Sequence, residues 1–272
     1  MDFPTRKLQV NGLQMNVLIA GEGPPVLLVH GFPDTHQVWR KQIQPLLDAG
    51  YQVIAPDTRG CGETDMPARV ADYQRDILVQ DLLALLNVLQ IDKVRLVAHD
   101  WGAVIGWQFA MAHPERVERY IPLSVGHPAA YASGGLAQKL KGWYVFVFQL
   151  PWFPEWLLQA GNWWIFRTVI AFPEEFAHWQ RTLSRSGRLT AGINYYRANF
   201  DVFLSKSGAK VKVPVYGIFS TGDRYLTEGQ MRESAQYVDA PFRCEIIRGA
   251  NHWLQVDAPE KVNPLLLELL RT

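Results

Sequence analysis

Short apolar runs alternate with stretches of helical periodicity over the first half of the chain. Three runs have the pattern of strands that are covered on both faces: 26–30 (VLLVH), 51–57 (YQVIAPD) and 94–99 (VRLVAH). Apolar residues recur every three or four positions in the stretches that follow them: 39–47, 77–89 and 101–111. A further strand is predicted over 120–125. This alternation predicts an α/β protein with a mostly parallel sheet and helices on both of its faces.

The segment 8–20 (LQVNGLQMNVLIA) has the pattern of two strands joined by a tight turn. Asn11-Gly12 at its centre is a strong hairpin signal, because both residues adopt positive φ angles readily. The sequence therefore predicts a β-hairpin near the N-terminus.

The α/β rhythm breaks over residues 128–210. This segment shows no strand-like alternation and is rich in tryptophan and phenylalanine. Two strands and a closing helix are predicted after it: 213–220, 242–249 and 258–270. We interpret 128–210 as a helical cap, or lid, inserted into an α/β core made of 1–127 and 211–272.

The most apolar stretch of the chain, 143–158, is not a clean membrane span. It is interrupted by polar residues and prolines: Gln149, Pro151, Pro154 and Glu155. We interpret its aromatic side chains as the wall of a pocket, with a contact to lipid as the alternative.

Composition narrows the function classes. With 48% hydrophobic and 19% charged residues, the chain has the composition of a globular protein. Its 27 Lys and Arg nearly balance 26 Asp and Glu, so nucleic acid is not an expected partner. Two cysteines, Cys61 and Cys244, are too few for a disulfide framework, and the N-terminus lacks the apolar region of a signal peptide. A reducing, cytoplasmic location is expected, and the oligomeric state stays open, a homodimer included.

The turn Ala98-His99-Asp100-Trp101-Gly102 has the form small-x-nucleophile-x-small. It lies between a predicted strand and a predicted helix, which is the setting that a nucleophile elbow requires. Asp100 at its apex is either a nucleophile or an N-cap residue of the following helix. These five residues alone do not decide between the two roles.

Two further residues favour the nucleophile. Asp223 and His252 each follow a different predicted strand, so the order along the chain is Asp100, Asp223, His252. This is the order of nucleophile, acid and base in α/β-hydrolases. A histidine held by a carboxylate is a general base. The loop HGFP (30–33) supplies a third element, because backbone N–H groups of Phe32 and Trp101 are expected to form an oxyanion hole.

The chain resembles the epoxide hydrolase branch of the α/β-hydrolase superfamily, which is related to the haloalkane dehalogenases. The resemblance covers nearly the whole chain and rests on five motifs: HGFP (30–33), DTRGCGETDMP (57–67), AHDWGA (98–103), GHP (126–128) and NHWLQVDAPEKVN (251–263). It implies an eight-stranded sheet with a helical cap after strand six. The chain departs from the family at Cys61 and Thr64, where Tyr and Ser are usual; we interpret Cys61 as a small buried filler.

The resemblance also implies two cap tyrosines that donate O–H groups to the oxygen of an epoxide. The pattern Tyr-x-x-x-Phe-Gln-x-Pro is matched by 144–151 and nominates Tyr144. The pattern Asn-aromatic-Tyr-Arg is matched by 194–197 and nominates Tyr196, with Tyr195 as the fallback. The alternative is that these tyrosines only pack in an aromatic-rich cap.

The function expected from these residues is hydrolysis of an apolar epoxide to a vicinal diol. A carboxylate is already ionised at neutral pH, so Asp100 can attack an sp3 carbon without a base. His252, held by Asp223, would then activate the water that hydrolyses the resulting ester. The substrate is expected to contact five residues: Phe32, Pro33, His99, Trp101 and Trp253. No metal-ligand cluster and no phosphate-binding glycine loop occurs in the sequence, so no cofactor is expected.

Other functions use parts of the same pattern. A haloalkane dehalogenase is the nearest alternative, because the Trp101 indole could hold a halide; those enzymes usually carry Asn where this chain has Phe32. Fluoroacetate dehalogenases carry Arg in place of Trp101, and an esterase would carry Ser in place of Asp100. A non-catalytic ligand-binding protein of this fold would be expected to lack part of the site, and this chain has all of it.

Overall fold

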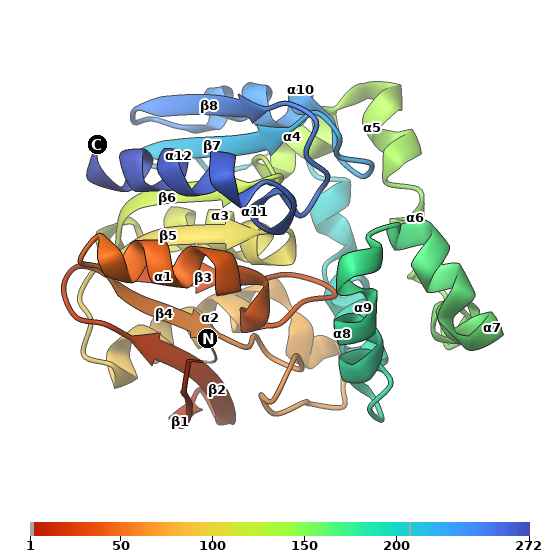
Figure 1. The fold of residues 1–272 in the computed structure, drawn as a ribbon. Helices are drawn as coiled ribbons and strands as arrows, with labels where there is room; N and C mark the ends of the chain where they lie inside the picture. Colours follow the sequence, from red (N-terminus) through yellow and green to blue (C-terminus); the bar gives the residue numbers. More distant parts are fainter. Residues whose placement is uncertain (1–2, 207) are drawn as a thin grey trace.

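The computed structural model describes residues 3–206 and 208–272 and contains one eight-stranded sheet. The strand order is β1-β2-β4-β3-β5-β6-β7-β8 (Figure 1). The strands are β1 (Thr5–Val10), β2 (Leu13–Ala20), β3 (Pro25–Val29), β4 (Gln52–Pro56), β5 (Val94–His99), β6 (Val117–Leu123), β7 (Val215–Ser220) and β8 (Phe242–Ile247). The α/β architecture predicted from the sequence is confirmed; predicted strand ends differ from these bounds by up to three residues.

The first two strands form the predicted hairpin. β1 and β2 pair antiparallel, and the turn residues Asn11 and Gly12 have φ angles of 47° and 79°. β2 also pairs antiparallel with β4, so this edge of the sheet differs from the parallel remainder. The turn chemistry therefore fixes the register of the sheet's edge.

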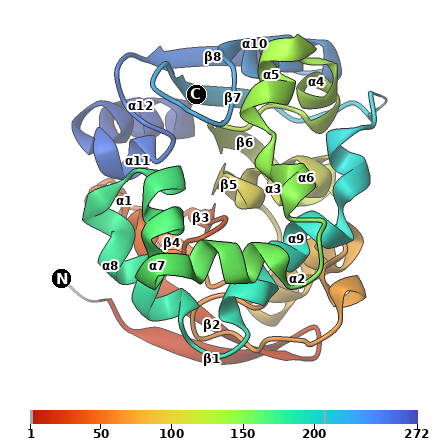
Figure 2. The ribbon, with the colours of Figure 1, turned by 90° about the vertical axis from the view of Figure 1, so that its right-hand side faces the viewer.

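Helices cover both faces of the sheet. Figure 2 shows α1, α11 and α12 on one face and α2 and α3 on the other. The helices of the core are α1 (Arg40–Asp48), α2 (Arg75–Val88), α3 (Trp101–Ala112), α10 (Glu228–Glu233), α11 (Leu254–Asp257) and α12 (Pro259–Arg271). Short 3-10 turns accompany them: η1 (His36–Trp39), η2 (Val70–Tyr73), η3 (Pro114–Arg116) and η5 (Ser234–Tyr237). The sheet is thereby enclosed, and most of its apolar residues are buried.

The strand order places a crevice at one end of the sheet. The chain passes from β3 to β4 on one side and then returns to β5 on the other side of β3. At such a switch point the loops that follow the two strands separate and leave a crevice at their carboxyl ends. The HGFP loop follows β3 and Asp100 follows β5, so both meet at this crevice.

The segment between β6 and β7 is helical in its described part and covers the carboxyl ends of the strands (Figure 1). It contains α4 (Pro128–Ser133), α5 (Gly135–Lys141), α6 (Tyr144–Val147), α7 (Phe153–Ile170), α8 (Pro173–Leu183), α9 (Arg188–Ala198) and η4 (Phe200–Phe203). We call α4 to η4 the lid helices. None of the helices in the described ranges is long and apolar enough to cross a membrane.

The lid helix α5 is fastened to the loop that follows β7. The Lys141 ammonium donates hydrogen bonds to the carbonyls of Asp223 and Leu226, and the Gln138 amide donates to the carbonyl of Tyr225 at 2.9 Å. Gln138 also accepts from the backbone N–H of Thr227 at 2.9 Å. One face of α5 is therefore held against the loop that carries Asp223.

Candidate active site

Asp100 lies on a strained turn between β5 and α3. Its φ and ψ angles are 52° and −126°, a conformation that non-glycine residues rarely adopt and that is typical of functional turns. Two glycines allow the close packing of this turn. A Cβ atom at Gly102 would lie 2.2 Å from the carbonyl oxygen of Val29, and one at Gly31 would lie 2.2 Å from Asp100 Oδ1. The Asp100 side chain makes no capping hydrogen bond to α3, so it does not act as an N-cap.

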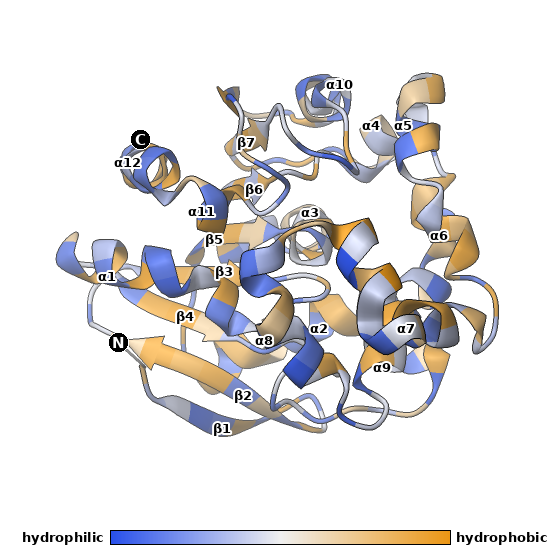
Figure 3. Cartoon of the chain, turned by 45° about the vertical axis from the view of Figure 1, so that its right-hand side comes forward, coloured by the Kyte–Doolittle hydropathy of each residue, from blue (hydrophilic) through white to orange (hydrophobic). Residues whose placement is uncertain are grey.

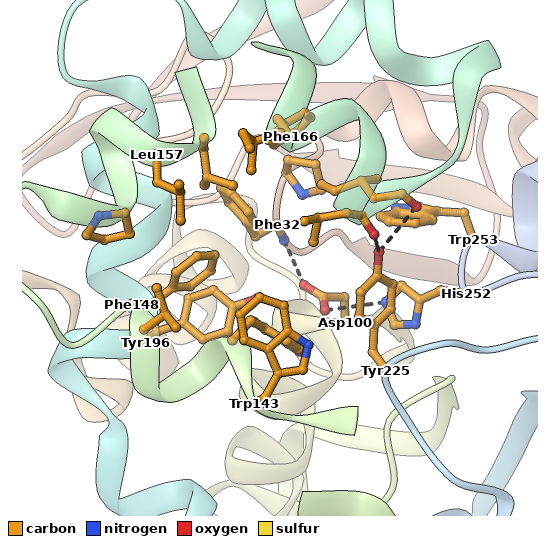
Figure 4. A pocket seen from close by; sticks show the side chains of 18 residues that line it. Phe32, Asp100, Trp143, Phe148, Leu157, Phe166, Tyr196, Tyr225, His252 and Trp253 are labelled. Carbon is orange, nitrogen blue, oxygen red and sulfur yellow. Dashed lines mark hydrogen bonds and ion pairs between the residues drawn. The ribbon is translucent and has the colours of Figure 1, made fainter. Parts of the chain in front are cut away.

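The structure brings Asp100, His252 and Asp223 together in one hydrogen-bonded row. His252 Nε2 lies 3.4 Å from Asp100 Oδ2 (Figure 4), and His252 Nδ1 lies 2.7 Å from Asp223 Oδ2. The other oxygen of Asp223 accepts from the backbone N–H groups of Tyr225 and Leu226 at 2.8 and 2.9 Å. Asp223 is thus fixed by its own loop, and its free oxygen is directed at the histidine ring.

The two carboxylates control the charge of His252. Burial by itself lowers the pKa of this histidine, but the negative charges of Asp223 and Asp100 outweigh burial and raise the pKa to about 10. Burial likewise raises the pKa of Asp100, and the hydrogen bond and charge of His252 more than reverse this, so the Asp100 pKa is lowered. At neutral pH the site therefore holds an ionised Asp100 beside a protonated histidine.

Backbone N–H groups surround one oxygen of Asp100. The N–H of Phe32 donates to Asp100 Oδ1 at 2.8 Å, and the backbone of Trp101 also hydrogen-bonds this carboxylate. His30 holds the loop that carries Phe32: its Nδ1 lies 2.9 Å from the carbonyl oxygen of Gly31, and its Nε2 accepts from the N–H of Thr58 at 3.0 Å. With Oδ1 held in this way, Oδ2 is the oxygen available for bonding to a ligand.

A pocket of about 710 Å³, a volume that includes its open mouth, lies above Asp100 (Figure 4). Five of its lining residues carry a carboxylate, an imidazole or a hydroxyl: Asp100, Tyr144, Tyr196, Tyr225 and His252. The remaining lining residues are apolar or tryptophan: Phe32, Pro33, Trp143, Val147, Phe148, Pro154, Leu157, Leu158, Ile165, Phe166, Val169, Ile170 and Trp253. The pocket fits an apolar molecule with few polar atoms.

Tyr144 and Tyr196 both line this pocket, and their rings contact each other at a centroid distance of 5.9 Å. Burial raises the pKa of both hydroxyls well above the usual value for tyrosine, so they stay protonated. Tyr195 does not line the pocket; its hydroxyl donates to the carbonyl of Arg59 at 2.7 Å. The fallback residue Tyr195 is therefore engaged elsewhere, while Tyr144 and Tyr196 face the cavity that Asp100 borders.

The two tyrosine-bearing helices are tied together by residues of the same motifs. Gln149 donates to the carbonyl of Tyr196 at 3.2 Å. Arg197 donates to the carbonyls of Phe148 and Leu150 and forms a two-pronged ion pair with Glu155 at 2.7 and 2.9 Å. These bonds connect α9 to the segment between α6 and α7. They fix the separation of Tyr144 and Tyr196.

The other predicted substrate contacts divide into two groups. Phe32, Pro33 and Trp253 line the pocket. Trp101 borders a second, smaller cavity on the other side of Asp100, where it packs edge-on against Tyr196 at 5.0 Å. His99 borders neither cavity.

The substrate contact predicted for His99 has no basis in the geometry. Its side chain is fully buried behind His252, with the two ring centroids 4.7 Å apart. Its Nε2 lies 3.0 Å from the carbonyl oxygen of His252. Burial and the neighbouring His252 lower the pKa of His99 to about 3, so it is a neutral ring that supports the His252 backbone. The residue before the apex of the turn points to the sheet, and the sequence pattern does not reveal this.

Asp34 and Tyr225 belong to the site and were not singled out from the sequence. Asp34 is buried and accepts hydrogen bonds from the indole N–H groups of Trp179, on α8, and Trp253, at 2.7 and 2.9 Å. Tyr225 donates to the carbonyls of Val169 and Ile170 at 3.1 and 3.2 Å. Both residues connect the core to the lid helices. The sequence signal that could have identified them is their position: Asp34 comes directly after HGFP, and Tyr225 lies two residues after Asp223.

Cys61 does not line the pocket. Burial raises the pKa of its thiol to about 11, so it is almost entirely protonated at neutral pH. Within the described ranges, no group of three or more His, Cys, Asp or Glu side chains is placed to hold a metal ion.

Comparison with known proteins agrees with this geometry. Residues 24–259 match the family described as the alpha/beta hydrolase fold. The chain is 35% identical to Epoxide hydrolase 3 of Xenopus tropicalis, over 97% of this chain and 77% of that protein. It is 31% identical to Epoxide hydrolase A of Mycobacterium tuberculosis, over 99% and 98% of the two chains. The crystal structure of epoxide hydrolase VrEH1 from Vigna radiata superimposes with a TM-score of 0.84 at 30% identity, over 98% and 97% of the two chains. The chain belongs to the α/β-hydrolase superfamily, in its epoxide hydrolase branch.

Proposed function

We propose that this protein hydrolyses an apolar epoxide to a vicinal diol through an ester formed on Asp100. The observation that carries the proposal is the combination of an ionised Asp100 with two uncharged tyrosine hydroxyls around one apolar pocket. A carboxylate is a nucleophile for carbon, and a neutral phenol is a donor for a developing alkoxide. The named relatives are themselves epoxide hydrolases.

In the first step, Asp100 Oδ2 attacks one epoxide carbon and the bond from that carbon to the ring oxygen breaks. The ring oxygen takes a proton from Tyr144 or Tyr196, which gives a 2-hydroxyalkyl ester of Asp100. Oδ1 stays with the N–H of Phe32, 2.8 Å away in the free protein. Holding the carboxylate on one side leaves its other oxygen directed at the substrate.

In the second step, water attacks the carbonyl carbon of the ester and gives a proton to His252. The ester carries no charge, so the contribution of Asp100 to the raised pKa of His252 disappears once the ester has formed. The imidazolium can then give its proton to the tyrosinate left by the first step. As a neutral ring it acts as a base, held in orientation by Asp223. The N–H groups of Phe32 and Trp101 stabilise the oxyanion, each worth about 3 kcal/mol. The diol leaves with the proton of His252 on its new hydroxyl. The carboxylic acid formed at Asp100 then gives its proton to His252, which restores the starting carboxylate and imidazolium.

A halide leaving group is less well served by this pocket. A halide needs N–H donors, and two of the nearby indoles are engaged: Trp253 donates to Asp34, and the Trp101 side chain hydrogen-bonds Tyr196. Trp143 also brings an indole N–H to the pocket, whereas Tyr144 and Tyr196 present a pair of hydroxyls, which suit an alkoxide. Haloalkane dehalogenation is therefore the weaker alternative.

We infer that the chain is organised as a core of 1–127 and 211–272 with a lid of 128–210, of which residues 1–2 and 207 lie outside the described part. The support is that the lid helices supply both tyrosines, while the core supplies Asp100, Asp223 and His252. The lid then presents the proton donors and the core the nucleophile and base.

The test is product analysis on the purified protein with styrene oxide and, in parallel, a bromoalkane. The expected result is a diol from the epoxide and no bromide from the bromoalkane, with Asp100→Ala as the inactive blank. Bromide without a diol would show that the leaving group is held by indoles and would overturn the assignment. Absence of both products from a folded protein, over a panel of aryl and alkyl epoxides, would count against catalysis of either reaction.

A further inference from the structure

The tryptophans of this chain fall into two distinct groups. Six of the ten are buried: Trp39, Trp101, Trp107, Trp163, Trp179 and Trp253. The other four are all more than half exposed, at 52, 71, 60 and 62%: Trp143, Trp152, Trp156 and Trp164. All four lie around α6 and in α7, and none is found elsewhere on the described surface.

Four more exposed apolar side chains belong to the same part of the lid. We call the resulting set the lid face: Leu136, Leu140, Trp143, Phe146, Leu150, Trp152, Trp156 and Trp164. Four half-exposed tryptophans alone leave an apolar area on the order of several hundred Å². Contiguous exposed patches of that size mark interaction sites rather than ordinary protein surface.

The helices that carry the lid face are apolar on both sides. Val147 and Leu158 line the pocket from the inner side of α6 and α7, whereas Phe146 and Trp156 point to the solvent side. α7 also exposes Gln159, Asn162 and Thr168. Apolar side chains as large as phenylalanine and tryptophan, on the outer side of a helix, normally contact protein or lipid. Gln138 and Lys141 hold the inner side of α5 against the core, which leaves Leu136 and Leu140 outward. The outer side of this layer thus lacks a partner in the described chain.

The three helices form the outermost layer over the pocket. Figure 2, which looks onto this side of the molecule, shows α5, α6 and α7 in a continuous path nearest the viewer. Figure 3 shows hydrophobic colouring on the outer turns of α6 and α7. The residues of the lid face therefore lie on, or between, consecutive helices of one outer layer.

The charges around the lid face are of one sign. Over residues 135–170 the exposed charged residues are Lys139 and Arg167, both positive. The one acidic residue of this stretch, Glu155, is largely buried and paired with Arg197. The chain as a whole has a net charge of only +1, so a wholly basic surface stretch is a local feature.

We propose that the lid face docks on the surface of a lipid bilayer that contains anionic lipid. Tryptophan is the residue that prefers the boundary between lipid and water, and basic residues beside it are attracted to anionic headgroups. A second copy of this chain is a poorer partner, because the exposed charges of 135–170 are both positive and two copies of this stretch offer each other no opposite charge. The docking is peripheral: the face lies on the membrane and nothing spans it.

This orientation has a consequence for the proposed function. Trp143 belongs both to the lid face and to the lining of the pocket. Docking would therefore place the pocket wall beside the layer in which apolar molecules dissolve. This consequence depends on the proposed epoxide substrate, whereas membrane binding itself does not and is measured without substrate.

The test is co-sedimentation of the protein with phosphatidylcholine vesicles and with vesicles that also contain phosphatidylglycerol. We expect binding to both, with the anionic vesicles preferred, and quenching of tryptophan fluorescence by brominated lipid. Trp156→Ser combined with Trp164→Ser is expected to weaken binding by about tenfold or more. Lys139→Gln is expected to weaken binding to the anionic vesicles by about fivefold and to leave the neutral vesicles unaffected.

Val88→Ser is the matched control, since Val88 is 47% exposed on α2 and lies outside the lid face. This variant should bind like the unaltered protein, and all variants should keep their melting temperature and their turnover of a water-soluble epoxide. An unaltered protein that stays in the supernatant with both vesicles, and whose fluorescence is unquenched, would overturn the proposal. A dimer that the double tryptophan variant dissociates, without vesicle binding, would overturn it in favour of a second copy as the partner.

Discussion

At the scale of single residues, the site combines a buried charge row with two neutral hydroxyls. His252 lies between Asp100 and Asp223, within ion-pair distance of the first and hydrogen-bonding distance of the second. Tyr144 and Tyr196 border the same pocket with pKa values raised by burial. Asp100 and the two tyrosines are held in the protonation states that their proposed roles require, and His252 becomes a base once the ester removes the charge of Asp100.

Tyr144→Phe and Tyr196→Phe should each lower kcat/KM for an epoxide by about 100-fold or more, because each removes a donor to the leaving oxygen. Tyr195→Phe is the control, since its hydroxyl is bonded to the Arg59 carbonyl. It should reduce stability by about 1 kcal/mol and leave kcat/KM nearly unchanged. Steady-state kinetics on the three variants checks this; equal losses for Tyr195→Phe and Tyr196→Phe would contradict the assignment.

Asp34 makes a testable contribution to the pH dependence of stability. Burial raises its pKa to about 7, and the indoles of Trp179 and Trp253 oppose this only in part. The folded protein therefore holds a proton on Asp34 that the unfolded chain has lost, so stability falls as pH rises from about 4 to about 7. As pH rises over this range, the melting temperature of the unaltered protein should fall relative to that of Asp34→Asn. A difference that is independent of pH would refute this account of Asp34.

At the scale of helices, the lid is held to the core by specific polar bonds. Arg197 joins α9 to the segment between α6 and α7, and Gln138 and Lys141 join α5 to the loop that carries Asp223. Bonds of this kind set the distance between the tyrosines of the lid and the aspartate of the core.

Arg197→Met should lower the free energy of unfolding by about 2 kcal/mol or more, because it leaves Glu155 with no partner in a largely buried place. It should also lower kcat for the epoxide, since Tyr196 loses its fixed position. Thermal unfolding and kinetics measure the two effects. Unchanged kcat with reduced stability would show that the bonds of Arg197 do not position Tyr196.

Some elements could be predicted from the sequence because local chemistry determines them. The hairpin follows from Asn11-Gly12, and the strand-turn-helix at 94–112 follows from the small residues around Asp100. The orientation of the lid aromatics could not be predicted. Because α7 carries apolar residues on both its inner and its outer side, its periodicity does not distinguish Leu158, which lines the pocket, from Trp156, which faces solvent. Of the aromatics in 143–158, Trp143 and Phe148 line the pocket as expected, whereas Trp152 and Trp156 do not.

The site could be predicted only in part, because some of its residues are recognisable along the chain and others only from their contacts in the fold. The order Asp100, Asp223, His252 is visible along the chain, and the structure places the three residues together. Their catalytic roles stay predictions. Asp34 is recognisable only in three dimensions, because its partners Trp179 and Trp253 are distant in sequence.

At the scale of the whole molecule, His252 couples the site to overall stability. Its pKa is about 10 in the folded protein and near 6.5 in an unfolded chain, so its stabilising contribution is complete below pH 6.5 and is lost as pH rises to 10. Against His252→Gln, the unaltered protein should lose stability, on the order of a few kcal/mol, between these limits. Chemical unfolding at several pH values tests this; a constant difference would contradict the charged histidine.

The central claim is that Asp100 forms an ester that water then hydrolyses at its carbonyl carbon. The most direct measurement is a single turnover in ¹⁸O-labelled water, with the protein in excess over the epoxide, followed by mass analysis of the peptide that contains Asp100 and of the diol. The account predicts ¹⁸O in the Asp100 carboxylate and unlabelled oxygen in the diol. Label in the diol, with none in the peptide, would mean that water attacks the epoxide directly and would contradict the account.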